Sequence, residues 1–239
     1  MKKLVEYISE SYEYTHNLSK SEQDWVNYNK GKSEVQPKTK NKVQPKSKKE
    51  LIKIINDSFE KGVYDLNFID ISKKPSYDKS LYQIFRDPLF KIKRNKITVD
   101  VSNWDVTEYD RIDCLFFDCP CIETVIGLET WDVSNVKDFT EFFSQCSNLK
   151  NVNVSGWKLH NATMTCAMFY YCKNLKKIDG IDTWDFKDNS RINMTNMFCN
   201  CNNLTDIGDI DYWENVIRYK DGMFYRCNKL TPPMWYRKR

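Results

Sequence analysis

Cysteine is the residue type in this chain with the greatest capacity for chemistry, and there are nine of them. The pairs Cys119-Pro-Cys121 and Cys199-Asn-Cys201 suggest sulfur ligands for zinc, although structural zinc sites favour two-residue gaps and four converging ligands. The odd cysteine count and the absence of a secretory signal argue against a disulfide framework. Buried free thiols are therefore the favoured interpretation, with a metal site and a disulfide as the alternatives.

The remaining chemically active residues do not form a recognisable catalytic pattern. His16 and His160 are the only histidines, and neither has a nucleophile and an acid at the spacing of a catalytic triad. The seven glycines are scattered singly, so there is no phosphate-binding loop. Acid pairs such as Asp209/Asp211 fall in predicted turns. We therefore expect a non-enzymatic protein with no cofactor and no bound metal.

The cysteines recur within a longer pattern that points to tandem repeats. Five units carry Phe-x-x-Cys with an apolar residue before the phenylalanine and Ile or Leu three residues after the cysteine: Phe116–Cys119, Phe143–Cys146, Phe169–Cys172, Phe198–Cys201 and Phe224–Cys227. A tryptophan opens each unit, at positions 104, 131, 157, 184 and 213. Residue types that keep one register over five units indicate a stacked repeat architecture.

Each unit is too small to bury both of its sides, so neighbouring units must cover one another. Segments such as Leu149–Val154 mix apolar and polar positions as a half-buried strand does, and Thr140–Phe143 is helix-like with Thr140 as a candidate cap. With a degenerate first unit at 65–85, the sequence predicts an α/β, leucine-rich-repeat-like solenoid. It would have about six repeats of about 27 residues, each with a short strand and a short helix. The tryptophans are assigned to the core rather than to a sugar-binding platform.

The motif apolar-Phe-x-x-Cys-x-x-Leu, followed by the corner Trp131-Asp132-Val133-Ser134-Asn135-Val136, resembles the BspA-like leucine-rich repeats, in a phage-encoded variant. The resemblance covers about residues 66–235. It implies a solenoid used for recognition, without a shared enzymatic activity. Residues Asp105, Asp132 and Asp185, together with Asn135, are expected to satisfy backbone groups of the corner turns.

The segment before the repeats divides into three parts. Residues 1–29 form a candidate anchor peptide with Leu4, Ile8 and Tyr12 at helical spacing. Within this peptide, Met1-Lys2, Glu6-Tyr7-Ile8 and Glu10-Ser11 together resemble N-terminal peptides of phage head proteins. Residues 30–47 are a Lys/Pro-rich linker, and residues 48–62 are a capping helix that covers the first unit. The repeat region is 63–239. Eight lysines between Lys30 and Lys49 leave nucleic-acid binding by this tail as an alternative.

The polar positions of the predicted strands should align on one exposed face, the surface that repeat proteins use for partners. The candidate partner-binding residues are Glu123, Thr124, Lys150, Asn151, Lys176, Lys177, Thr205 and Asp206. Lysines occupy the middle of this series and acids its ends. The pattern favours a protein partner with an acidic centre.

These observations together favour a binding or structural protein. The leading hypothesis is a component of a phage virion or a host-contact protein, so the partner would be a capsid protein or a host protein. The alternatives are an intracellular module that sequesters a host protein, and a nucleic-acid-associated protein. No run approaches the roughly 18 apolar residues of a membrane span, and no signal peptide opens the chain. The expected location is the virion or the host cytoplasm.

Overall fold

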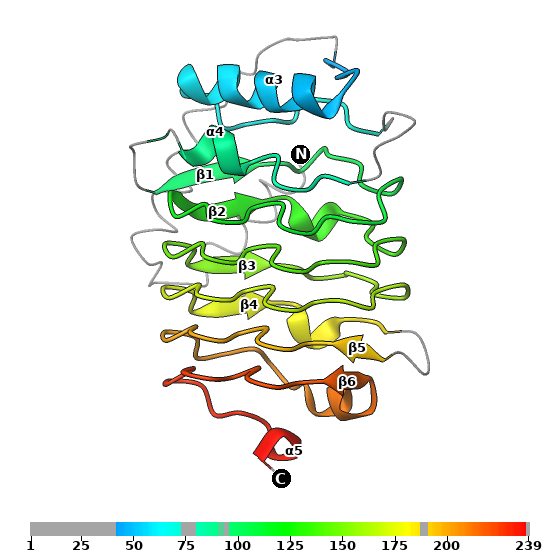
Figure 1. Cartoon of the computed structure of the whole chain (residues 1–239), viewed down its shortest axis with the longest axis vertical. Helices are drawn as coiled ribbons and strands as arrows, with labels where there is room; N and C mark the ends of the chain where they lie inside the picture. The colour runs from blue at the N-terminus through cyan, green and yellow to red at the C-terminus, as the bar shows by residue number, and fades with distance from the viewer. Residues whose placement is uncertain (1–41, 73–79, 91, 93–95, 187–190, 238–239) are drawn as a thin grey trace, which may run out of the picture. The chain divides into compact units, whose positions relative to one another are not determined.

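The computed structural model describes residues 42–72, 80–90, 92, 96–186 and 191–237, all within one unit of the chain, Asn41–Arg239. Its elements follow one another from α3 at one end of this unit to α5 at the other (Figure 1). The helices are α3 (Lys48–Glu60), α4 (Arg86–Phe90) and α5 (Met234–Arg237), with short 3-10 helices η3 (Leu128–Thr130), η4 (Ile181–Thr183) and η5 (Asp211–Asn215). The strands are β1 (Ile97–Asp100), β2 (Ile122–Ile126), β3 (Asn151–Asn153), β4 (Lys177–Asp179), β5 (Ile192–Asn193) and β6 (Ile217–Tyr219).

Successive units lie in parallel rows. The strands pair as β1–β2, β3–β4 and β5–β6, each pair parallel. A separate series of single parallel bridges runs through Ser80, Arg111, Asp138, Met164 and Asn193, the last of which belongs to β5. Because bridged partners lie one sequence repeat apart, the repeat found in the sequence is also the repeat of the structure.

Two aromatic ladders form the core. The repeated phenylalanines stack from Phe85 through Phe116, Phe143, Phe169 and Phe198 to Phe224, with centroids 4.6 to 5.8 Å apart. The unit-opening tryptophans are all buried, and Trp157, Trp184 and Trp213 stack in sequence. The assignment of phenylalanine and tryptophan to the core is therefore confirmed.

The predicted fold class is wrong. The sequence suggested an α/β, leucine-rich-repeat-like solenoid with one strand and one short helix in each repeat. The strands instead form separate two-stranded sheets, and the α-helices of the described residues lie outside the five Phe-x-x-Cys units. Each unit is a succession of turns with a short strand or a single bridge. The 3-10 helices η3 and η4 directly precede Trp131 and Trp184, η5 contains Trp213, and none of the three contains a repeated phenylalanine.

The backbone around Phe143 shows why the predicted helix is absent. Glu141 (φ 56°) and Gln145 (φ 65°) are left-handed, a conformation that an α-helix cannot contain. The N–H groups of Glu141 and Phe143 donate to carbonyls of the next unit, at 2.9 and 2.8 Å, while that of Phe142 donates within its own turn to Phe139. A helix needs every N–H for its own i−4 carbonyl, so donation to the next unit excludes it.

Helix α3 lies close to its predicted span. Ser47 caps it by accepting the Glu50 N–H at 3.1 Å, and Leu51, Ile55 and Phe59 form its buried face. The ring of Phe59 stacks on Phe85, the first member of the phenylalanine ladder. The helix therefore covers the start of the ladder.

The end of the predicted linker is part of the folded unit. The N–H of Val43 donates to the Phe68 carbonyl at 2.8 Å, and its own carbonyl accepts from Asp70 at 2.9 Å. Pro45 is buried. Residues 42–47 are thus docked through the buried Pro45 ring and the backbone bridge between Val43 and Ile69, although the lysines there suggested a linker.

A strand face and its neighbouring sites

The eight candidate partner-binding residues lie on adjacent rows, which we call the strand face. The N–H of Lys150 donates to the Glu123 carbonyl at 3.1 Å, that of Lys176 to Lys150 at 2.8 Å, and that of Thr205 to Lys176 at 3.0 Å. Beside this column, Asn151 pairs with Lys177 in β3–β4, and Lys177 bridges to Asp206. The structure therefore brings these positions together in the expected order.

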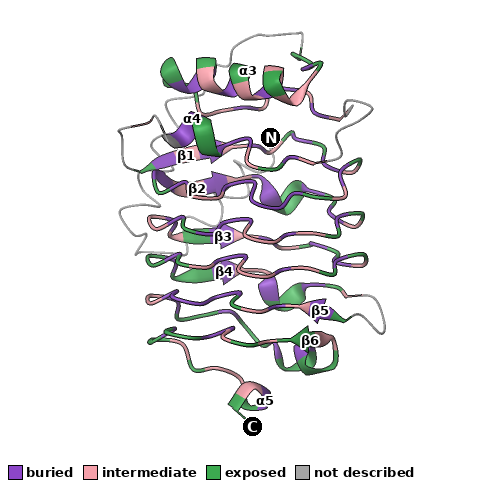
Figure 2. Ribbon diagram, viewed as in Figure 1, coloured by how far each residue is buried: buried purple, intermediate pink, exposed green. Residues whose placement is uncertain are grey.

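The strand face is more open in its later rows. Asn151, Lys176, Lys177, Thr205 and Asp206 are exposed, whereas Glu123, Thr124 and Lys150 are partly buried. Figure 2 shows exposed stretches, in green, along β3 and β4. The accessible part of the strand face is consequently smaller than the eight residues that the sequence suggested.

Ion pairs further reduce the charge that the strand face can offer. The ammonium of Lys150 contacts Glu123 Oε1 at 2.5 Å, and that of Lys177 contacts Asp179 Oδ1 at 2.6 Å. The hydrogen bond and the attraction from Asp179 raise the pKa of Lys177, so it is fully protonated at neutral pH. Among the described residues, no carboxylate forms an ion pair with Lys176. Of the three lysines on the strand face, the exposed Lys176 is therefore the one most available to a partner.

The repeated cysteines form a second regular feature, the cysteine ladder: Cys119, Cys146, Cys172, Cys201 and Cys227. All five are buried and all nine cysteines of the chain are free thiols, so the predicted ladder is confirmed. Four thiols donate to the phenylalanine carbonyl of the preceding unit, Cys146, Cys172, Cys201 and Cys227 at 2.9 to 3.0 Å. The thiol thus combines a small apolar body with a donor for a buried carbonyl.

Burial keeps the cysteine ladder in its neutral form. It raises the pKa of Cys172 and Cys201 well above the ordinary value, and that of Cys227 to about 12. Thiolate, the form that binds metals and attacks electrophiles, is therefore scarce at neutral pH. Within the ranges that the structure describes, no group of three or more His, Cys, Asp or Glu side chains is arranged to hold a metal ion.

Three of the four predicted corner residues act in turns, whereas the carboxylate of the fourth, Asp185, lies 2.9 Å from His160 Nε2. Asp105 and Asp132 each accept a backbone N–H two residues later at 3.0 Å, and the Asn135 side chain donates to the Thr107 carbonyl at 3.0 Å. These contacts are local or join neighbouring units. The corner aspartates are thus structural acceptors.

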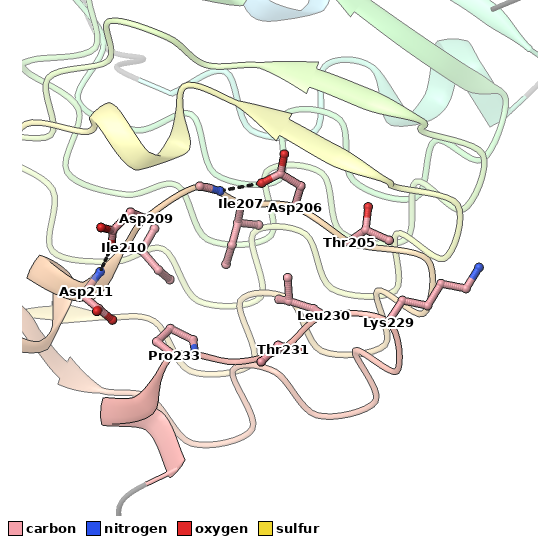
Figure 3. Close-up of a pocket in the computed structure, with 11 residues that line it drawn as sticks. Thr205, Asp206, Ile207, Asp209, Ile210, Asp211, Lys229, Leu230, Thr231 and Pro233 are labelled. Atoms are coloured by element: carbon pink, nitrogen blue, oxygen red, sulfur yellow. Dashed lines mark hydrogen bonds between the residues drawn. The ribbon is translucent and has the colours of Figure 1, made fainter.

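One feature escaped the sequence-based search. Residues 205–211 and 229–233 line a cavity of about 290 Å³ beside the last row of the strand face (Figure 3). The signal in the sequence is Thr231-Pro232-Pro233, which stands where earlier units have strand residues.

Other predicted sites lie outside the described residues. The candidate anchor residues Leu4, Ile8 and Tyr12 belong there, as do residues 30–41, most of the lysine-rich segment with which nucleic acid was associated. Residues 42–49 are described and belong to the docked segment and the start of α3.

Comparison with known families gives one match. A family described as "Mycoplasma protein of unknown function, DUF285" matches residues 80–213 and 153–235, together about two thirds of the chain. The chain belongs to the DUF285 family. Two overlapping matches of one model are what tandem repeats produce. DUF285 is related to the BspA-like repeats, so the resemblance is confirmed at this level.

The other comparisons add no relative to this DUF285 protein. No curated protein and no solved structure matches it. Among the described residues, none of the helices has the length and apolar character needed to cross a membrane.

Proposed function

We propose that this DUF285 protein is a non-enzymatic repeat protein that binds a protein partner through its strand face. The observation that carries the proposal is the adjacent exposed pair Lys176 and Lys177, with Lys176 outside any ion pair of the described residues. The pair lies on a β-row whose neighbours are locked by backbone hydrogen bonds. A rigid row of this kind presents its charges without an ordering cost on binding.

The partner surface is acidic. Glu123 neutralises Lys150 at the earlier, partly buried end of the strand face, so the positive charge is concentrated at Lys176 and Lys177. Exposed charges of this kind steer encounter and set the salt dependence of binding. We expect the association to weaken as ionic strength rises.

The finer assignment is a phage virion or host-contact component, whose partner is a capsid protein or a host protein. The resemblances to a phage-encoded BspA-like variant and, at the N-terminus, to phage head-protein peptides support it. The competing assignment is sequestration of a host protein in the cytoplasm. Mass spectrometry of purified particles separates the two, because a virion component is present in stoichiometric amount and a sequestering protein is absent.

The strand face is tested by Lys176→Glu/Lys177→Glu in a quantitative pull-down from host lysate and from disrupted particles. Reversing two exposed charges is expected to weaken capture of the main partner by roughly 5- to 30-fold, about 1–2 kcal/mol. The matched control is Lys137→Glu/Lys158→Glu, which makes the same change in net charge at two exposed lysines away from the strand face. Equal capture by both variants would contradict the proposed face.

Deletion of residues 1–22 tests the candidate anchor separately. Among the described residues the core cluster begins at Leu51, and we expect the deletion to leave the thermal stability unchanged. Loss of particle association with retained lysate capture assigns the anchor to the N-terminal segment. If the truncated protein keeps both particle association and lysate capture, the whole interaction is assigned to the strand face.

A further inference from the structure

The rows of the strand face are bonded in one direction. Each row donates its N–H to a carbonyl of the row before it, from Lys150 to Glu123, from Lys176 to Lys150 and from Thr205 to Lys176. Each carbonyl in this column therefore points toward the following row. The row at 205–209 is the last, and the same geometry directs its carbonyls toward the position of a further strand.

Within the part of the chain that the structure describes, no segment supplies that further strand. Thr231 follows Thr205 by one repeat, and the next two residues are prolines. Proline has no N–H to donate and cannot continue a ladder of this kind. In the described part of the chain, residues 229–233 form no bridge with 205–209, and the cavity of about 290 Å³ opens between the two segments (Figure 3).

We propose that this open edge, residues 205–209, binds an extended cationic peptide as an added parallel strand. Thr231 stands in the donor position of this column, and among the backbone hydrogen bonds of the described residues none joins its N–H to the row at 205–209; Pro232 and Pro233 have no N–H to add. An incoming strand supplies these donors, and an unpaired strand edge is a template for such addition. Ile207 is buried and Leu230 is partly buried where they line the cavity, so they offer an apolar floor for alternate side chains of the peptide.

The charge of the lining determines the kind of peptide. Asp206, Asp209 and Asp211 are exposed and line the cavity, against one lysine, Lys229. The ammonium of Lys229 is hydrogen-bonded to Asn203 Oδ1 at 2.7 Å. The excess of carboxylates favours lysine or arginine side chains on the bound strand and disfavours acidic ones.

This site goes beyond the proposed function of the strand face. It recognises backbone N–H groups and cations, whereas the strand face presents lysines to an acidic partner. Its failure would leave the pull-down results at Lys176 and Lys177 untouched, so the two proposals are distinguishable.

The test is fluorescence anisotropy with the full chain and a labelled hexapeptide of alternating valine and lysine. We expect saturable binding by this peptide, and none by a hexapeptide with glutamate in place of lysine. A version of the cationic peptide N-methylated at alternate residues should also lose binding, because it lacks the N–H groups. Asp206→Asn/Asp209→Asn/Asp211→Asn keeps the side-chain acceptors and should weaken binding about tenfold. Asp105→Asn/Asp132→Asn/Asp185→Asn is the matched control and should leave binding unchanged.

Three outcomes overturn the proposal. One is absence of saturable binding by the cationic peptide. A second is equal binding of the N-methylated peptide, or an equal effect of both triple variants, which would mean that general charge attraction is sufficient. The third is a dimer, detected by light scattering, that the cationic peptide does not dissociate, because a second copy would then occupy the edge.

Discussion

Truncation of one phenylalanine in the middle of the stack tests its cohesion. Phe169 is fully buried, and its ring stacks on Phe143 and on Phe198, each with a centroid separation of 5.8 Å. Phe→Ala in a core typically costs about 3–5 kcal/mol, and each stacked aromatic pair adds about 0.5–1.5 kcal/mol beyond burial. With two such pairs, Phe169→Ala should fall in the upper half of the range, at about 4–5 kcal/mol.

Phe224 is the matched position near the end of the phenylalanine ladder. It stacks on Phe198 at 5.4 Å and makes a T-shaped contact with Tyr236 of α5, with the ring centroids 4.9 Å apart. The last unit can also detach while the others remain folded, which limits the cost that its loss can impose. We expect about 2–3 kcal/mol for Phe224→Ala, at least about 1 kcal/mol less than for Phe169→Ala.

The measurement is urea unfolding followed by tryptophan fluorescence and by far-UV circular dichroism. Phe169→Ala should shift the whole transition. Phe224→Ala should instead give a shallower or biphasic curve, because the terminal unit unfolds first. If both variants lost the same free energy of unfolding and kept the wild-type slope of the urea transition, units that depend only on their neighbours would be refuted.

Three further predictions follow from the thiols and the glycines. In native protein the cysteine ladder should react with a thiol reagent far more slowly than Cys166, which is only partly buried; equal rates would contradict the buried ladder. Because folding raises the pKa of Cys227 from 9.0 to about 12, the folded state retains protons that the unfolded state loses. The stability that this thiol contributes is intact below about pH 9 and falls as pH rises from 9 toward 12. A midpoint for urea unfolding that stays constant from pH 8 to pH 11 would show that the ladder thiols do not contribute in this way. Gly180→Ala should destabilise more than Gly156→Ala, since a Cβ at Gly180 would lie 2.3 Å from Ser155 Cα whereas Gly156 has open space. Gly156→Ala should cost only the left-handed strain of about 1–2 kcal/mol, and thermal denaturation that ranks the two in the opposite order would contradict the close approach.

The sequence predicted the repeat, its register and most of its core. The tryptophans and the Phe-x-x-Cys motif recur at nearly constant spacing, and identical apolar types at identical register positions must stack if each unit is covered by its neighbours. The amphipathic stripe of Leu51, Ile55 and Phe59 likewise determined α3, since only one helical face can be buried there.

The tertiary structure decided the local conformation within each unit. Thr140–Phe143 has the composition of a helix, yet alternate N–H groups bond to the next unit and Glu141 becomes left-handed. The sequence also did not determine how much charge the strand face offers to a partner, because the ion pairs of Lys150 and Lys177 depend on side-chain geometry. The physical reason is the same in both cases. The periodicity of the sequence indicates which side chains are buried together. The backbone hydrogen bonds and the ion pairs, in contrast, form between neighbouring rows, and only the tertiary structure determines which groups of those rows meet.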